Sequence, residues 1–477
     1  MKKILIANRE EIAVRIIKTI REMGLSSVAV YSDVDRASPH VGLADEAVLL
    51  GAAPPSESYL SIDKIIAAAQ SVGADAIHPG YGFLSENAEF ARAVVKSGMT
   101  FIGPTPEAME IMGSKLMAKS AVAKYGIPMV PGTDSAIEDS MEALSSARSI
   151  GFPVLIKASA GGGGKGMRIV EGEEEFESQL ERAQSEALKA FGDGSVFIEK
   201  YITSPRHIEI QILADQHGNC IHLGERECSI QRRHQKVIEE APSALLTDEM
   251  RSEMGSAAIL VAKSCNYEGA GTVEFIVDEN LNYYFLEMNT RLQVEHPVTE
   301  MTTGYDLVEQ QIRVARGEIL AIDQEDVKTN GHAIELRVYA EDPMDNFLPG
   351  TGRLTRYSIP VGDGIRVDDG LREGLEIPIH YDPMIAKLVV HAPSRSLAIQ
   401  KMADAIRNYT IEGVPNTLIF GSFVMQSEAF KSGNFNTHFI RDLFNPTQIH
   451  ANEDLMEVAA LLAAKLQSEY KAKVQIT

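Results

Sequence analysis

The segment from Glu287 to Pro297 is the richest in side chains that could do chemistry. Its polar residues occur at every second position, and they are Glu287, Asn289, Arg291, Gln293 and Glu295. In an extended strand this spacing places them on one face, with Met288, Leu292 and Val294 on the other. Two interpretations stay open: a solvated strand face, or a site that combines carboxylates, amides and a cation.

A predicted hairpin would add a second carboxylate to this segment. If the run 271–277 pairs with 283–288, Glu274 lies opposite Glu287. Two facing carboxylates repel each other unless a cation bridges them, and oxygen ligands suit Mg²⁺ or Mn²⁺ held together with nucleotide phosphates. The register is a hypothesis, because Asn280-Leu281 is not a preferred hairpin turn. The alternative is a pair of exposed acids on an edge strand.

A glycine-rich run, Gly161 to Lys165, directly follows a predicted strand at 153–158. Glycines let backbone N–H groups approach an anion closely, and Lys157 and Lys165 add positive charge. The run is not a Walker A loop, because Gly166 stands where Ser or Thr must bind magnesium. It is therefore either a flexible connection between strands or a lid over phosphates.

A fourth cluster lies within Gln231 to Lys236, where four potential cations, Arg232, Arg233, His234 and Lys236, fall within five residues. The chain has a formal net charge of −22, so this local concentration is unusual. It is either a solvated loop or a site that recognises an anion. Cys228 has no partner at metal spacing and is predicted to be structural.

The elements that must position these residues form about three packed units, since 477 residues exceed a single core. Alternating strands and helices over residues 1–113 predict a parallel sheet covered on both faces. Residues 114–203 follow as linker helices and a small glycine-rich unit. Residues 204–446 predict an antiparallel or mixed sheet. Residues 447–477 form an amphipathic helical tail that packs on its own domain or contacts a partner.

Composition excludes several classes of function. Acidic residues number 67 against 45 Lys and Arg, so such a surface would repel nucleic acid. No apolar run approaches the roughly 18 residues that span a bilayer. Three cysteines without paired spacing indicate neither a disulfide scaffold nor a zinc site, so a reducing cytoplasm is expected.

Six motifs carry a resemblance to a known family. They are Ile6-Ala-Asn8-Arg9, His78 to Asn87, Met112-Gly-Ser-Lys115, the glycine run, Gln231-Arg-Arg-His-Gln-Lys236 and Glu287 to Pro297. Together they closely resemble biotin carboxylase, an ATP-grasp enzyme, from residue 1 to about 445. The resemblance implies an α/β and α+β protein with an ATP-grasp fold. Its parts would be a Rossmann-like pre-ATP-grasp N-terminal domain, a mobile glycine-rich lid domain and a C-terminal biotin carboxylase domain.

The same resemblance assigns the nucleotide and metal residues. Those for ATP are Lys115, Lys157, Gly163, Gly164, Glu199, Lys200, Tyr201, Ile202, His207, Gln231, His234, Glu274 and Glu287. Those for Mg²⁺ or Mn²⁺ are Glu274, Glu287 and Asn289. Within the ATP set, residues 199–202 would be the hinge segment that receives adenine, and the two glycines would cover the phosphates.

The resemblance also assigns the residues around bicarbonate and biotin, which are Lys236, Arg291, Gln293, Val294, Glu295, Arg337, Tyr81 and Gly82. The implied catalytic residues are Lys236, Arg291, Glu295 and Arg337. Glu295 would deprotonate bicarbonate, and Arg337 would stabilise charge on the ureido oxygen. A positioned base and a retaining cation are needed in any case, because bicarbonate is a poor nucleophile.

The implied reaction is ATP-dependent carboxylation of biotin by bicarbonate through carboxyphosphate, giving carboxybiotin, ADP and phosphate. No Met-Lys-Met sequence occurs. Biotin is therefore expected on a separate carrier protein or subunit, with a separate carboxyltransferase. A homodimer is expected from charged positions at Arg15, Lys18, Glu22 and Arg366. The final acceptor, whether acetyl-CoA, propionyl-CoA, pyruvate or 2-oxoglutarate, is not specified by the sequence.

Two rival functions and one departure remain. The rivals are another ATP-grasp ligase that activates a carboxylate or bicarbonate, and a silent nucleotide-binding assembly subunit. The departure is Glu10, where the family usually has glycine. Positive φ is unfavourable for glutamate, so we expect Glu10→Gly to change stability or assembly more than turnover.

Overall fold

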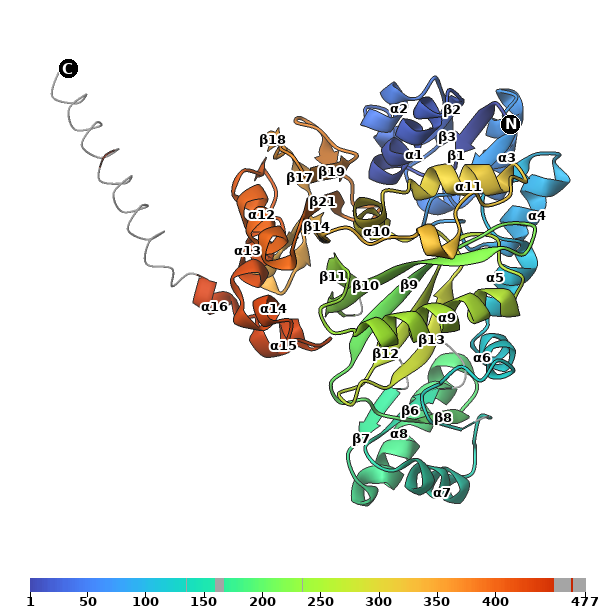
Figure 1. The fold of residues 1–477 in the computed structure, drawn as a ribbon, viewed down its shortest axis with the longest axis vertical. Coiled ribbons are helices and arrows are strands. Elements are labelled where there is room, and N and C mark those ends of the chain that lie inside the picture. Colours follow the sequence, from blue (N-terminus) through green and yellow to red (C-terminus); the bar gives the residue numbers. More distant parts are fainter. Residues whose placement is uncertain (134, 159–166, 234, 450–464, 466–477) are drawn as a thin grey trace.

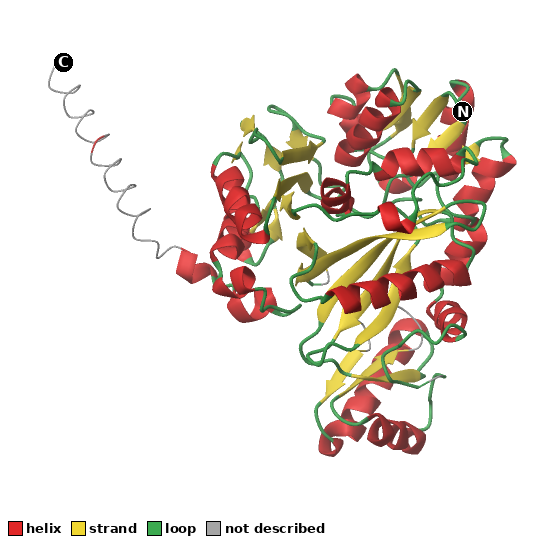
Figure 2. Cartoon of the chain, in the orientation of Figure 1, coloured by secondary structure: helices red, strands yellow, loops and turns green. Residues whose placement is uncertain are grey.

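The chain folds around three sheets, each with its own helices, as Figures 1 and 2 show. The computed structural model describes residues 1–133, 135–158, 167–233, 235–449 and 465. The mixed α/β architecture expected from the sequence is confirmed. No helix among the described residues is both long and apolar enough to cross a membrane.

The N-terminal sheet is parallel, as predicted, with strand order β3-β2-β1-β4-β5. Its strands are β1 (Lys3–Ile6), β2 (Ser26–Ser32), β3 (Glu46–Gly51), β4 (Ala76–His78) and β5 (Thr100–Phe101). Its helices are α1 (Glu10–Glu22), α2 (Pro39–Leu43), α3 (Ile62–Ser71), α4 (Ala88–Lys96) and α5 (Pro106–Gly113). The run from Ile4 to Ile6 is fully buried, because helices cover both faces of the sheet.

The turn between β1 and α1 contains the residue that departs from the expected pattern. Glu10 adopts a φ of +51° and is buried, with its carboxylate against the Arg9 guanidinium. Gly370 packs directly on this turn. A Cβ on residue 370 would lie 2.3 Å from the Glu11 backbone nitrogen, so only glycine fits there. The glutamate is thus held in the left-handed region by its surroundings.

A second, smaller body follows the helix α6 (Lys115–Ala123). It consists of α7 (Ser140–Ile150), β6 (Val154–Ala158), β7 (Met167–Val170), α8 (Glu173–Phe191) and β8 (Val196–Lys200). The strands form an antiparallel sheet of order β7-β6-β8, and one apolar cluster joins them to α7 and α8. Figure 1 shows this body at the far end of the molecule from the N-terminal sheet.

The large sheet has eight antiparallel strands in the order β13-β12-β9-β10-β11-β14-β21-β19. They are β9 (Arg206–Ala214), β10 (Cys220–Arg232), β11 (Gln235–Ala241), β12 (Gly269–Val277), β13 (Tyr283–Asn289), β14 (His332–Tyr339), β19 (Ile365–Asp369) and β21 (Met384–Ala392). Its helices include α9 (Asp248–Ser264), α10 (His296–Thr303), α11 (Leu307–Ala315), α12 (Arg395–Arg407) and α13 (Leu418–Gln426). Two apolar clusters cover different parts of this sheet, one under α9 and one under α12 and α13.

Short elements complete the C-terminal part. Three ribbons pair β15 (Glu341–Asp342) with β16 (Leu348–Pro349), β17 (Gly352–Arg353) with β20 (Glu376–Ile377), and β18 (Arg356–Ser358) with β22 (Thr410–Glu412). Three short helices follow, α14 (Glu428–Ser432), α15 (Phe439–Leu443) and α16 (Pro446–Ile449). Most of the tail predicted at 447–477 lies outside the described residues, and the domain boundaries given above stay predictions.

Candidate active site

A cleft of about 2030 Å³ lies between the three sheets and collects most of the predicted site residues. Those that line it are Tyr81, Gly82, Lys115, Lys157, Glu199, Lys200, Tyr201, Ile202, His207, Gln231, Lys236, Glu274, Glu287, Asn289, Arg291, Gln293, Val294 and Arg337. Glu295 is buried behind them. Gly163, Gly164 and His234 lie outside the described residues. Motifs far apart in the sequence therefore converge on one site.

Lys236 stands at the centre of the buried part of this cleft. Its Nζ lies 2.8 Å from Glu274 Oε1 and 2.6 Å from Glu295 Oε1, and it also contacts Glu209. Burial alone would lower the pKa of Lys236, but the three carboxylates raise it well above its usual value. The ammonium is thus retained at neutral pH and can bind an anion.

Glu295 is held between two cations. Its second oxygen, Oε2, lies 2.8 Å from Arg337 Nη2, while Arg337 Nε lies 2.7 Å from Glu239 Oε1. Burial would raise the pKa of Glu295, yet Lys236 and Arg337 hold it well below its usual range. The side chain is therefore an ionised carboxylate, and its affinity for a proton is low while both cations contact it.

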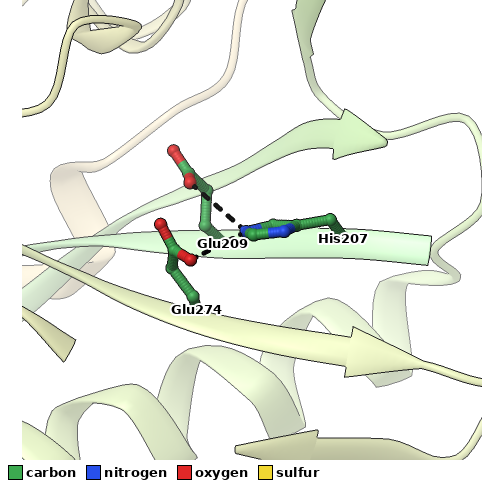
Figure 3. Close-up of side chains that lie close together, drawn as sticks. All are labelled: His207, Glu209 and Glu274. Atoms are coloured by element: carbon green, nitrogen blue, oxygen red, sulfur yellow. Dashed lines mark ion pairs between the residues drawn. The ribbon is translucent and has the colours of Figure 1, made fainter. Parts of the chain in front are cut away.

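A second buried group continues this cluster, and Figure 3 shows its three side chains, His207, Glu209 and Glu274. His207 Nε2 lies 3.0 Å from Glu274 Oε2 and 3.9 Å from Glu209 Oε2. Glu209 was not predicted from the sequence. The sequence did contain a signal for it, because His207 and Glu209 are two residues apart on β9 and residues at that spacing share one face of a strand.

The predicted pairing of Glu274 with Glu287 is confirmed by the register of β12 and β13. Asn289 Nδ2 lies 2.8 Å from Glu274 Oε1, and all three side chains line the cleft. Carboxylate and amide oxygens suit a hard divalent cation such as Mg²⁺ or Mn²⁺. The described donor set therefore fits the metal that was expected.

The prediction of one continuous strand from Glu287 to Glu295 is wrong. β13 ends at Asn289, and residues 290–295 form a loop before α10. Leu292 turns into the core, while Arg291 Nε reaches 2.9 Å to Glu86 Oε2 of the N-terminal domain. Val294 lies along the cleft and not on an opposite strand face. Packing of Leu292 and this cross-domain ion pair override the alternating pattern.

Arg291 is also fixed from within its own loop. Its Nη1 lies 3.0 Å from Gln293 Oε1, and its Nη2 lies 3.1 Å from Asn289 Oδ1. These bonds orient the guanidinium along the wall of the cleft. It faces the same cavity as Lys236, so two cations are available there for one small anion.

The other end of the cleft is built by the small sheet and α6. Glu199 on β8 pairs with Lys157 on β6 and lies 2.7 Å from Lys119 Nζ. Burial would raise the pKa of Glu199, but Lys157 and Lys119 lower it. Lys200 donates to the Gly151 and Phe152 carbonyls at 2.8 and 3.0 Å, so its side chain is already bonded within the chain.

Three families of known proteins together match most of the chain. The family "Biotin carboxylase, N-terminal domain" matches residues 1–109, "Carbamoyl-phosphate synthase L chain, ATP binding domain" matches 114–323, and "Biotin carboxylase C-terminal domain" matches 335–442. The biotin carboxylase of Nostoc sp. is 52% identical, over 92% of this chain and 99% of that protein. The chain belongs to the biotin carboxylase family.

Other relatives agree with this assignment. A pyruvate carboxylase subunit from Methanothermobacter thermautotrophicus is 52% identical, over 92% of this chain and 89% of its own length. The biotin carboxylase domain dimer of the Hydrogenobacter thermophilus 2-oxoglutarate carboxylase, solved with MgADP, ADP and bicarbonate, superposes with a TM-score of 0.86 at 50% identity. That match covers 92% of this chain and 97% of the other. Parts of two carboxylases with different names, pyruvate carboxylase and 2-oxoglutarate carboxylase, thus match this chain at 52% and 50% identity.

The charged positions expected at a dimer surface divide into two groups in this biotin carboxylase. Lys18 and Glu22 are exposed on α1. Arg15 is buried within the chain, 2.7 Å from Glu300 Oε1, and Arg366 Nη1 lies 2.8 Å from Glu300 Oε2. Arg15 and Arg366 are thus joined through one carboxylate inside the protomer.

Proposed function

We propose that this chain carboxylates biotin with bicarbonate and ATP, as the first half-reaction of a multisubunit carboxylase. The observation that carries the proposal is the buried group Lys236, Glu295 and Arg337 at the base of the cleft. It combines a base with two cations. The same cleft continues to Lys115, Lys157 and residues 199–202, where we propose that the nucleotide binds.

The first step activates bicarbonate. Lys236 and Arg291 hold the anion, and Glu295 takes its proton as one bicarbonate oxygen attacks the γ-phosphorus of ATP. The bond between this phosphorus and the β,γ-bridging oxygen breaks, releasing ADP and leaving carboxyphosphate. An anion bound at Lys236 would draw this cation from Glu295, which raises the affinity of Glu295 for the proton.

The second step transfers the carboxyl group. Carboxyphosphate breaks at its C–O bond into CO₂ and phosphate, and phosphate removes the ureido N–H proton of biotin. Arg337 stabilises the negative charge that develops on the ureido oxygen while the nitrogen attacks CO₂. Tyr81 and Gly82 line the same cleft and form part of the surface for the bicyclic ring.

A divalent cation would be held by Glu274, Glu287 and Asn289. When bound, it supplies charge that neutralises the phosphate oxygens of the nucleotide. The neighbouring Lys157 and Lys115 bind phosphate directly in this proposal, with Lys157 exchanging its contact with Glu199 for the nucleotide.

Biotin would arrive on a carrier protein or other biotinylated chain, and a separate carboxyltransferase would receive the carboxyl group. The relatives include one subunit of pyruvate carboxylase and the dimer of a 2-oxoglutarate carboxylase domain. We propose the same kind of assembly and a homodimer for this chain. The final acceptor would be chosen by the transferase.

The test is bicarbonate-dependent ATP hydrolysis with and without free biotin. We expect biotin to raise the rate, and we expect Arg337→Met to remove the stimulation because the ureido oxygen loses its cation. Arg313→Met, which removes an exposed guanidinium on α11, serves as the matched control and keeps the stimulation. The proposal fails if biotin has no effect on the unmodified chain, or if Arg337→Met is stimulated normally.

A further inference from the structure

The loop at 290–295 presents catalytic groups without a strand ladder to hold its peptide planes. Its Gln293 carbonyl accepts a bond from His296 Nδ1 at 2.7 Å, and its Val294 carbonyl accepts one from Lys387 Nζ at 3.0 Å. Both donors are fully buried, and neither lines the cleft. The His296 backbone N–H also donates to the Gln293 carbonyl, at 3.4 Å, so two side chains and one backbone bond hold the loop from behind.

Lys387 comes from the same pair of strands as Arg337. The two residues are opposite each other in the register of β14 and β21, so their side chains leave the sheet on one face. Arg337 contacts the Glu295 carboxylate, and Lys387 contacts the Val294 carbonyl. Two neighbouring strands of the large sheet thus contact two consecutive residues of the loop: β21 contacts Val294 and β14 contacts Glu295.

The charge of Lys387 is compensated within the interior. Its Nζ lies 3.2 Å from Glu11 Oε2 and 3.8 Å from Asp368 Oδ2. Burial would raise the pKa of Asp368, but Arg366 and Lys387 hold it far below its usual value, so it stays ionised. A buried ammonium with an ionised partner is a strong donor to a backbone carbonyl.

His296 donates as a neutral imidazole. Burial and the nearby cations, Lys387 first among them, lower its pKa well below the usual value. Since Nδ1 faces a carbonyl oxygen, which only accepts, the proton is assigned to Nδ1. The Gln293 carbonyl is thereby directed into the protein.

This arrangement fixes where the Val294 N–H points. The Gln293–Val294 peptide is not among the cis bonds, and in a trans peptide the N–H and C=O groups point in opposite directions. With the carbonyl turned toward His296, the N–H faces the side of the cleft that Val294 lines. No acceptor for this N–H is found within the described part of the chain.

We propose that His296 and Lys387 are positioning residues: His296 orients the Val294 N–H as a donor to bicarbonate, next to Arg291 and Lys236, and Lys387 fixes the following peptide plane, which joins Val294 to Glu295. This inference rests on the proposed function. Neither residue touches the substrate. Both act through the two loop carbonyls, so their loss weakens bicarbonate binding while the nucleotide end of the cleft is unaffected.

Two matched pairs of variants test the proposal. His296→Leu removes the donor to Gln293, whereas His296→Asn keeps an N–H in place of Nδ1. Lys387→Met combined with Glu11→Gln removes the donor to Val294 and its nearest carboxylate together, and Glu11→Gln alone is the control. Burial raises the pKa of Glu11 to about 7, which favours the neutral form that the glutamine amide imitates.

The readout is the KM for bicarbonate against the KM for ATP in biotin-stimulated ATP hydrolysis. We expect the KM for bicarbonate to rise about 10-fold or more in His296→Leu and in the double variant. His296→Asn and Glu11→Gln should stay within about 3-fold of the unmodified chain, and the KM for ATP within about 2-fold throughout. Thermal unfolding is followed in parallel.

Three outcomes are decisive. If the unmodified chain shows no biotin-stimulated hydrolysis, the proposed function fails, and the inference fails with it. If that activity is present but the folded removal variants keep the KM for bicarbonate, or lose only kcat, the positioning roles are overturned. Should the double variant not fold, the His296 pair decides alone, because His296→Asn restores the KM only if the donor itself matters.

Discussion

The two ends of the cleft differ in how their charges are paired. At the end where we propose that bicarbonate binds, the Lys236 side chain is 11% exposed and Glu295 is fully buried. At the proposed nucleotide end, the Lys157 side chain is 32% exposed and that of Lys119 is 41% exposed. Electrostatic interactions are stronger away from water. The first end is thus a preassembled charge network, and the second is a weak pairing that a ligand can replace.

The difference follows from the sheets that carry each end. The carboxylates around Lys236 come from β9, β12 and the loop beside β14, all within or against the eight-stranded sheet. The nucleotide end joins α6 to the separate three-stranded sheet. The proposed bicarbonate site is thus built on a single sheet, and the proposed nucleotide site lies between a helix and a separate sheet.

The largest expected effect comes from removing the base. Glu295→Gln keeps the shape but cannot accept a proton, so kcat for biotin carboxylation should fall about 10²- to 10⁴-fold. Glu199→Gln is the matched change at the nucleotide end and should retain kcat within about 10-fold while altering the KM for ATP. Steady-state kinetics on both variants checks this. A comparable loss of kcat in both would remove the distinction between the two ends.

The next effect concerns stability. Lys236→Met leaves three buried carboxylates facing one another, and breaking a buried pair in this way destabilises by about 3–5 kcal/mol. Lys157→Met affects a partly exposed pair and should change the free energy of unfolding by less than about 1 kcal/mol. Urea unfolding at pH 7 measures both. Equal shifts of the midpoint would show that burial does not set the strength of these pairs.

Glu10 gives the smallest and most specific test, because it is buried like Glu295 but has a strained backbone. Burial raises its pKa to about 7, although Arg9 lowers it. The folded state therefore binds this proton more tightly than the unfolded state, whose pKa is about 4.5. Stability is fully present below about pH 4.5 and falls as the pH rises through about 7.

Glu10→Gly removes both the raised carboxyl and the glutamate at a φ of +51°. We expect it to stabilise the protein by about 1 kcal/mol or more above pH 7, with a smaller gain near pH 5, and to leave kcat nearly unchanged. Thermal unfolding between pH 5 and pH 8 follows the trend. A lower Tm at pH 8 would mean that the contact with Arg9 outweighs strain and burial.

Local pattern was sufficient for much of this architecture. Apolar runs and helical periodicity predicted the parallel N-terminal sheet, and the hypothesis that 271–277 pairs with 283–288 correctly placed Glu274 opposite Glu287. Resemblance supplied most of the cleft, since the motif residues converge there. These features depend on short segments, whose residue types and spacing are enough to predict their structure or their role.

What could not be predicted depends on contacts between distant segments. The strand predicted through Glu295 stops at Asn289, because Arg291 pairs with Glu86 some two hundred positions away. Lys387 and Glu239 carry no motif signal, and their contacts with Val294 and Arg337 arise only from the order of the large sheet. Sequence periodicity predicts which face of a strand or helix a residue occupies. It does not predict which side chain from another segment will contact that residue.

The most direct measurement follows the oxygen that bicarbonate gives to phosphate. With ¹⁸O-labelled bicarbonate, ATP and biotin, attack on the γ-phosphorus and later cleavage of the C–O bond leave one bicarbonate oxygen on phosphate. We therefore expect one ¹⁸O in each inorganic phosphate released by biotin-dependent turnover, measured by ³¹P NMR. Unlabelled phosphate formed at the same rate as carboxybiotin would contradict the proposed reaction.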